Sequence, residues 1–182
     1  MFDVASKSAG AQIVLATSCD DRYPPENIID GSDETFWPTT GLFPQEFVLT
    51  FASMMEIKRI NLACYNVKRI IFEKSEAPEP QKFEPLTERD GKCRLSNTVL
   101  SCIWCSEIKV KQLLFALVSL VEWKTPSKLS QMLEKTDRTL QHEEFSVPGG
   151  THMLHMRVLI ESGYDHFVSV HKLSIDGNAL HG

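Results

Sequence analysis

Short segments in which apolar and polar residues alternate dominate the chain. Alternation with a period of two is typical of a strand with one buried face, because successive side chains point to opposite sides of a sheet. Such segments, rich in β-branched and aromatic residues, predict strands at residues 13–18, 47–51, 57–66, 67–74, 145–147, 151–161 and 167–176. Turn signals at Pro148-Gly149-Gly150 and Ser162-Gly163 separate the last three of them.

The segments between the strands are predicted to be loops. Residues 23–44 carry several Pro and Gly residues and predict a long, structured loop. Residues 75–85 contain three prolines, whose missing amide donors predict a surface loop. Helical patterns are weak and confined to residues 110–121 and 128–135, where no cap coincides with the periodicity. Short strands at this spacing predict an all-β fold, either a sandwich or a jelly roll.

Composition narrows the class of protein further. The 182 residues are 42% hydrophobic and 24% charged, the proportions of one globular domain whose core can form without a metal ion or disulfides. The formal net charge of −5 gives no general attraction to phosphate backbones or acidic lipids. Nucleic acid is therefore not an expected partner.

The first residues, the longest apolar stretch and the cysteines indicate in which cellular compartment the protein is expected. The first residues lack the basic start and continuous apolar stretch of a secretory signal. The longest apolar stretch, residues 113–121, is shorter than the roughly 20 residues that a bilayer requires. The five cysteines are an odd number and favour reduced thiols. We expect neither secretion nor membrane insertion.

The most informative segment is P-E-N-I-I-D-G-S-D-E-T-F-W at residues 25–37. Asp30-Gly31 predicts a tight turn, after which the hydroxyl of Thr35 and nearby carbonyls can face the Asp30 carboxylate. Calcium prefers six to eight oxygen ligands at about 2.3–2.6 Å, which such a loop can supply. The alternative is that Asp30 only caps the turn, since the D-x-D-x-D pattern of an EF-hand is missing. Trp37 is expected to be buried beneath the loop.

This segment also carries a resemblance. The pattern N-I-I-D-G-x-x-x-T-x-W, preceded by A-T-S and followed by F-V-L-T-F and I-K-R-I, resembles discoidin-like domains of the coagulation factor 5/8 C-terminal type. Strings such as PPENIIDG and DHFVSVH are similar, more specifically, to the intraflagellar transport protein 25 family, also called heat shock protein beta-11. The similarity covers residues 11–90 and 132–177.

The resemblance implies a fold and a metal site. The fold would be a jelly-roll β-sandwich of the galactose-binding, discoidin-like kind, formed by residues 1–182 as one domain, with calcium at one end. The ligands would be the main-chain carbonyl of Asn27, the carboxylate of Asp30, and the hydroxyl and carbonyl of Thr35. Residues 169–171 would complete the shell, although they contain no carboxylate.

It also implies a function. The family's role is that of a non-enzymatic subunit of intraflagellar transport complex B, in the cilium or flagellum, at the ciliary base and in the cytoplasm. It would form a heterodimer with the Rab-like GTPase subunit, intraflagellar transport protein 27, contact other complex B subunits, and support transport of signalling cargo. The alternative is a carbohydrate- or lipid-binding discoidin-like module.

Catalysis is not expected from the polar residues near the C-terminus. Asp165 and His166 could be paired with Ser162 or Ser169 as a triad, but adjacent strand residues point to opposite faces and no G-x-S-x-G elbow is present. His155 is expected at the surface. The sequence thus predicts a protein that is not an enzyme.

Residues 91–131 interrupt the resemblance. The segment begins Gly-Lys and ends Ser-Gln, as translation through a GGT AAG splice donor and a CAG acceptor would give. We hypothesise that it is a retained intron or a gene-model error, and the alternative is a functional insertion in a loop. Its Cys102 and Cys105 have C-x-x-C spacing without a second ligand pair, which argues against a zinc site.

Overall fold

A computed structural model describes residues 3–86 and 130–180. Within these ranges the chain forms strands and two short 3₁₀ helices, and no helix there is long and apolar enough to span a membrane. The helices are η1 (Lys7–Ala9) and η2 (Pro25–Ile29). The strands are β1 (Gln12–Ala16), β2 (Trp37–Pro38), β3 (Gln45–Tyr65), β4 (Val67–Ser75), β5 (Glu84–Pro85), β6 (Ser130–Met132), β7 (Gln141–Gly163) and β8 (Ser169–Ala179). The predicted all-β class is confirmed.

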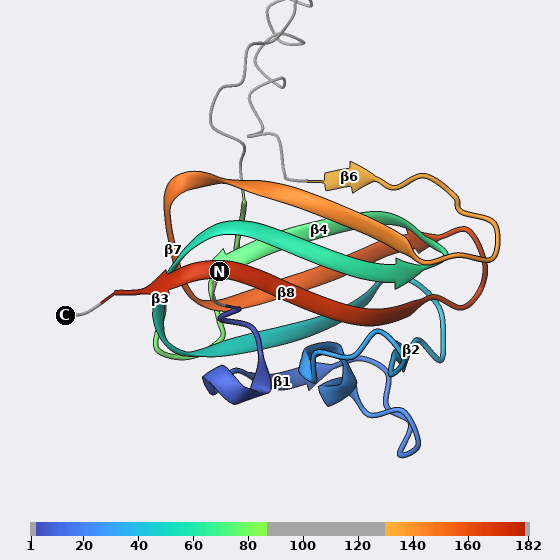
Figure 1. Ribbon diagram of the computed structural model, residues 1–182, viewed down its shortest axis with the longest axis horizontal. Coiled ribbons are helices and arrows are strands. Elements are labelled where there is room, and N and C mark those ends of the chain that lie inside the picture. Colours follow the sequence, from blue (N-terminus) through green and yellow to red (C-terminus); the bar gives the residue numbers. More distant parts are fainter. Residues whose placement is uncertain (1–2, 87–129, 181–182) are drawn as a thin grey trace, which may run out of the picture.

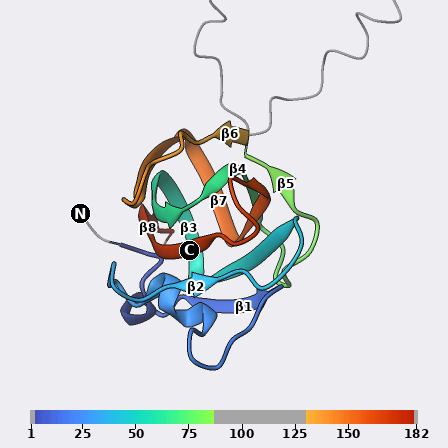
Figure 2. The ribbon, with the colours of Figure 1, turned by 90° about the vertical axis from the view of Figure 1, so that its right-hand side faces the viewer.

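Two long strands, β3 and β7, organise the sheet (Figure 1). All pairings are antiparallel, in the order β2-β8-β3-β7-β4-β5, with β1 added to β3 and β6 added to β4. The first part of β3 carries β1, with Gln12 opposite Thr50, whereas its second part carries β8, with Ile60 opposite Ile175. A register shift after Thr50 separates the two parts. Figure 2 shows the strands wrapped around one core, as in a jelly roll.

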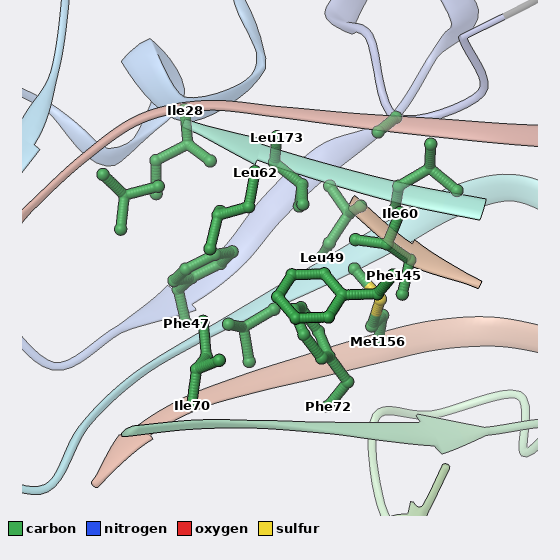
Figure 3. Packing of buried hydrophobic residues seen from close by; sticks show 14 of the residues in the cluster. Ile28, Phe47, Leu49, Ile60, Leu62, Ile70, Phe72, Phe145, Met156 and Leu173 are labelled. Carbon is green, nitrogen blue, oxygen red and sulfur yellow. The ribbon is translucent and has the colours of Figure 1, made fainter. Parts of the chain in front are cut away.

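The core lies between the strands and is filled by large apolar side chains from both halves of the described chain. Phe72 of β4 and Phe145 of β7 are buried, with ring centroids 4.8 Å apart. Figure 3 shows these rings packed with Phe47 and Leu49 of β3 and Met156 of β7. Each such buried side chain contributes roughly 1.5–3 kcal/mol of transfer free energy. The alternation of apolar and polar residues in the sequence therefore corresponds to a buried face of the sheet.

The turn predicted at residues 148–150 is wrong, because these residues lie inside β7. Ile57 faces Thr151, yet Arg59 faces Ser146, so four residues of β7 stand opposite one residue of β3. Gly150, with φ of 74°, absorbs the extra length. The Pro and Gly residues mark a bulge in one continuous strand, not the end of a strand.

The possible helix at residues 128–135 is also wrong over its described part. Ser130–Met132 forms β6, in which Gln131 faces Ile70 of β4. The predicted end of the 91–131 segment therefore falls inside β6. The rest of that segment lies outside the described residues, including Cys102, Cys105 and the helical pattern at 110–121. The predicted loop at 75–85 is confirmed for residues 76–83, whereas Ser75 ends β4 and Glu84–Pro85 forms β5.

Candidate functional site

The loop between η2 and β2, residues 30–36, is organised by the side chain of Asp30. One carboxylate oxygen, Oδ1, accepts a hydrogen bond from the backbone amide of Ser32 at 2.8 Å. The other, Oδ2, accepts one from the hydroxyl of Thr35 at 2.7 Å. Gly31 follows at φ of 88°, a left-handed conformation that favours glycine. The carboxylate therefore caps the turn, as one of the two sequence interpretations requires.

Asn27 closes the same loop from η2. Its side-chain Nδ2 donates to the carbonyl of Phe36 at 2.9 Å, which ties the start of the loop to its end. The structure thus bonds Thr35 directly to Asp30 and ties Asn27 to the residue that follows Thr35. Their neighbourhood is oxygen-rich, since the Thr35 hydroxyl also lies 3.4 Å from the carbonyl of Ser32.

This donor set suits a hard cation. One exposed carboxylate, one hydroxyl and several carbonyls are the oxygen ligands that calcium takes. Among residues 3–86 and 130–180, no three His, Cys, Asp or Glu side chains are grouped so as to hold a metal ion. A calcium ion at this loop would therefore rely largely on neutral oxygens and on Asp30.

A rigid base supports the loop. Trp37 is fully buried, as predicted, and its Nε1 donates to the carbonyl of Ser18 at 2.8 Å. Its ring meets that of Phe47 edge-on, with centroids 5.7 Å apart. Ile28 and Ile29 of η2 are buried beside it. Both ends of the loop are consequently anchored in the core.

Strand β8 holds the far side of the loop through His171. Its Nδ1 donates to the carbonyl of Asp33 at 2.9 Å, and its ring lies 5.2 Å from that of Phe36. Phe36 in turn stacks on Tyr23 at 4.6 Å. His171 thus contacts the loop through its imidazole, and whether residues 169–171 complete a calcium shell stays a prediction.

The rejected triad does not form in the structure. The carboxylate of Asp165 accepts from the backbone amide of His166, not from its ring. The hydroxyl of Ser169 bonds to His171. Asp165 and His166 lie in the exposed turn between β7 and β8.

Two buried polar residues were missed by sequence reasoning. His155 is only 3% exposed, so its predicted surface position is wrong, and its Nδ1 lies 2.8 Å from the Thr50 hydroxyl. Gln141 is 1% exposed and bonds the backbone amide and carbonyl of Val67, at 3.0 and 2.8 Å. Both residues satisfy backbone or hydroxyl groups inside the fold, and only their long-range partners reveal it.

Beside Gln141, burial raises the pKa of the Cys64 thiol to about 12. Its Sγ lies 3.6 Å from the Gln141 side-chain oxygen. The pKa of Glu143 is also raised, mainly by burial and to a smaller extent by the charge of Glu134. Cys64 is thus an inert structural thiol and not a nucleophile.

Comparison with known proteins decides the family. No family model matches the sequence. The chain is 34% identical over 179 residues to the intraflagellar transport protein 25 homolog of Homo sapiens, covering 98% of this chain and 94% of that protein. The chain belongs to the intraflagellar transport protein 25 family. The mouse homolog is 33% identical over 96% of this chain and 92% of its own length. Intraflagellar transport protein 25 of Chlamydomonas reinhardtii is 43% identical over 88 residues, 48% of this chain and 47% of that protein.

Solved structures confirm the fold of this family member. The family 32 carbohydrate-binding module of Clostridium perfringens NanJ, solved with galactose, matches with a TM-score of 0.60 at 11% identity, covering 95% of this chain and 97% of that one. The C-terminal domain of a chitobiase from Bacteroides fragilis matches with a TM-score of 0.62 at 15% identity, covering 97% and 98%. At such identities the likeness shows the jelly-roll fold alone, and the galactose belongs to the NanJ module.

Proposed function

We propose that this protein is a non-enzymatic subunit of intraflagellar transport complex B. The observation that carries the proposal is the similarity to intraflagellar transport protein 25 homologs over nearly the whole chain. The rigid antiparallel sandwich provides large surfaces for protein contacts. In this role the protein acts in the cilium or flagellum, at the ciliary base and in the cytoplasm, and supports transport of signalling cargo.

The proposed partner is the Rab-like GTPase subunit, intraflagellar transport protein 27. Co-expression of both proteins followed by size-exclusion chromatography tests this directly. We expect a one-to-one complex that elutes ahead of either subunit alone. Replacing the partner with an unrelated Ras-like GTPase of similar size provides the control and should give separate peaks. Separate elution of the two proposed partners would contradict the heterodimer.

We further propose calcium as the ligand of the loop at residues 30–36. The carboxylate of Asp30, the hydroxyl and carbonyl of Thr35 and the main-chain carbonyl of Asn27 would hold the ion. When bound, the ion would neutralise Asp30 and cross-link η2 to the segment before β2. The 2.7 Å hydrogen bond between Thr35 and Asp30 supports this assignment, because two oxygens that lie so close together could both contact one ion.

Thermal unfolding tests the calcium proposal. A ligand of the native state adds RT ln(1 + [L]/Kd), about 2.7 kcal/mol at one hundred times Kd, so calcium should raise the melting temperature by several degrees. Asp30→Ala should abolish this shift. Asp33→Ala is the matched control, since the Asp33 carboxylate lies 3.6 Å from Lys172 and is not a proposed ligand. If calcium and chelator leave the wild-type melting temperature unchanged, Asp30 is only a turn cap.

A further inference from the structure

Two Asp-Gly pairs lie in the described part of the chain, Asp30-Gly31 and Asp176-Gly177. A third pair, at residues 90–91, lies outside it. In such a pair the side-chain carboxyl of Asp adjoins a peptide nitrogen that no Cβ of the next residue shields. The pair can therefore close into a five-membered succinimide ring if the fold leaves it free to do so. The structure holds the two pairs in opposite ways.

The pair Asp30-Gly31 is exposed on the loop between η2 and β2. Nothing lies within 4 Å of the position that a Cβ of Gly31 would occupy, so the peptide has room to rearrange. Among residues 3–86 and 130–180, no acceptor is hydrogen-bonded to the Gly31 amide. Its nitrogen is thus not engaged by the fold.

The carboxyl group of Asp30 is turned toward the backbone that follows it. Its Oδ1 accepts a hydrogen bond from the amide of Ser32, two residues further along the chain. Its Oδ2 accepts one from the Thr35 hydroxyl. Donors on both oxygens polarise the carboxyl carbon Cγ and stabilise the negative charge that develops on oxygen when a nucleophile attacks it. The fold therefore presents an activated carbon beside the Gly31 nitrogen.

The pair Asp176-Gly177 is held inside strand β8, where both residues are buried. On one edge Gly177 is paired with Ile57 of β3, and on the other edge Asp176 is bridged to Asp3. A Cβ on Gly177 would lie 2.7 Å from the carbonyl of Glu56. An extended chain that is paired on both edges cannot turn its side chain back onto the next peptide.

We propose that Asp30-Gly31 is a site of isoaspartate formation. The Gly31 nitrogen attacks Cγ of Asp30, so that a C–N bond forms while one Cγ–O bond breaks. The oxygen leaves as water, with the amide proton and one proton from solvent. Water then adds to the main-chain carbonyl carbon of Asp30 and breaks its bond to the Gly31 nitrogen. The nitrogen regains a proton, and the new carboxylate returns one to solvent, so neither an oxidant nor a reductant is needed.

The product changes the loop and creates a substrate for a class of enzyme. The main chain now runs through Cβ and Cγ of residue 30, and the free carboxylate sits on Cα. The hydrogen bonds from Ser32 and Thr35 to the original carboxylate are lost together. L-isoaspartyl carboxyl methyltransferases transfer a methyl group from S-adenosylmethionine to such a carboxylate. An enzyme of this class is the partner that the modified loop would recruit.

Ageing of the purified full chain tests the inference. The protein is kept at neutral pH and physiological temperature in a chelating buffer, so that no metal ion holds Asp30. Isoaspartate is quantified by methyl transfer from S-adenosylmethionine with a purified L-isoaspartyl methyltransferase, and is located by peptide mapping with electron-transfer dissociation. We expect it to accumulate at Asp30 more than about tenfold faster than at Asp176, because β8 must open before Asp176 can react.

The same protein in urea provides the matched control, because both pairs are then free and should react at similar rates. Asp30→Glu should remove the methyl-accepting signal of the folded protein and keep its melting temperature, since attack there would close a less favoured six-membered ring. A folded protein in which Asp30 reacts no faster than Asp176 would overturn the inference. A rate at Asp30 that rises about tenfold or more on unfolding would also overturn it, because the loop would then protect the pair.

Discussion

At the scale of the residue, Gly163 leaves the least room for a side chain among the glycines of the described residues. A Cβ there would lie 2.5 Å from Val168, 2.8 Å from Phe43 and 2.9 Å from the carbonyl of Asp165. Gly163→Ala should lower the free energy of unfolding by about 1–3 kcal/mol, measured by urea denaturation. Gly149→Ala is the control, since nothing lies within 4 Å of its Cβ position, and should be neutral. Equal stability of the two variants would contradict the packing.

The two described cysteines should differ sharply in reactivity. Cys19 is exposed, whereas Cys64 is buried with its pKa raised to about 12 from the ordinary 9.0. Iodoacetamide at pH 8, followed by peptide mapping, should label Cys19 and spare Cys64 until the protein unfolds. Because the folded pKa is the higher one, the contribution of the neutral thiol to stability is complete below pH about 9 and is lost as the pH rises toward about 12. Equal labelling of Cys19 and Cys64 in the folded protein would contradict the burial of Cys64.

Residue-level prediction succeeded where local chemistry decides the outcome. The tight turn at Asp30-Gly31 follows from turn geometry, and the burial of Trp37 follows from its side-chain type. The structure has both. His155 and Gln141 could not be predicted, because their partners lie 105 and 74 positions away in the chain. In a strand where apolar and polar residues alternate, a polar residue is predicted to be exposed unless its distant partner is known.

At the scale of the element, an ion-pair network joins β3, β4 and β7. Arg157 of β7 bonds Glu73 of β4, with Nε 2.7 Å from the carboxylate, and lies 3.7 Å from Glu46 of β3. Glu73 is only 6% exposed, so removing its partner leaves a buried charge. Arg157→Ala should cost about 3–5 kcal/mol of unfolding free energy. Adding Glu73→Leu should recover most of that loss, and failure to recover it would show that the network is not the cause.

Predicted strands matched the observed ones in position but not in length. The segments expected at 47–51 and 57–66 are parts of the single strand β3, and those at 145–147 and 151–161 are parts of β7. Local sequence shows where alternation stops, at the register shifts and the bulge. It cannot show that pairing with a neighbour carries the strand across them, since that depends on residues far away in the chain.

At the scale of the whole molecule, the buried cluster is built from residues on both sides of the segment that precedes β6. Deleting residues 91–129 keeps β6 and should leave the melting temperature within a few degrees and the GTPase complex intact. Loss of that complex only in the deleted form would show a functional insertion.

Reverse-transcription cloning is the complementary measurement, and a sole product containing codons 91–131 would refute the intron hypothesis.

The central claim is that this jelly roll is an intraflagellar transport subunit, and live imaging in cilia tests it most directly. The protein carries a fluorescent tag and is followed together with a tagged core subunit of complex B. We predict processive movement in both directions along the cilium, with the two signals on the same particles. A signal that diffuses freely, or never enters cilia in which the core subunit moves, would contradict the account.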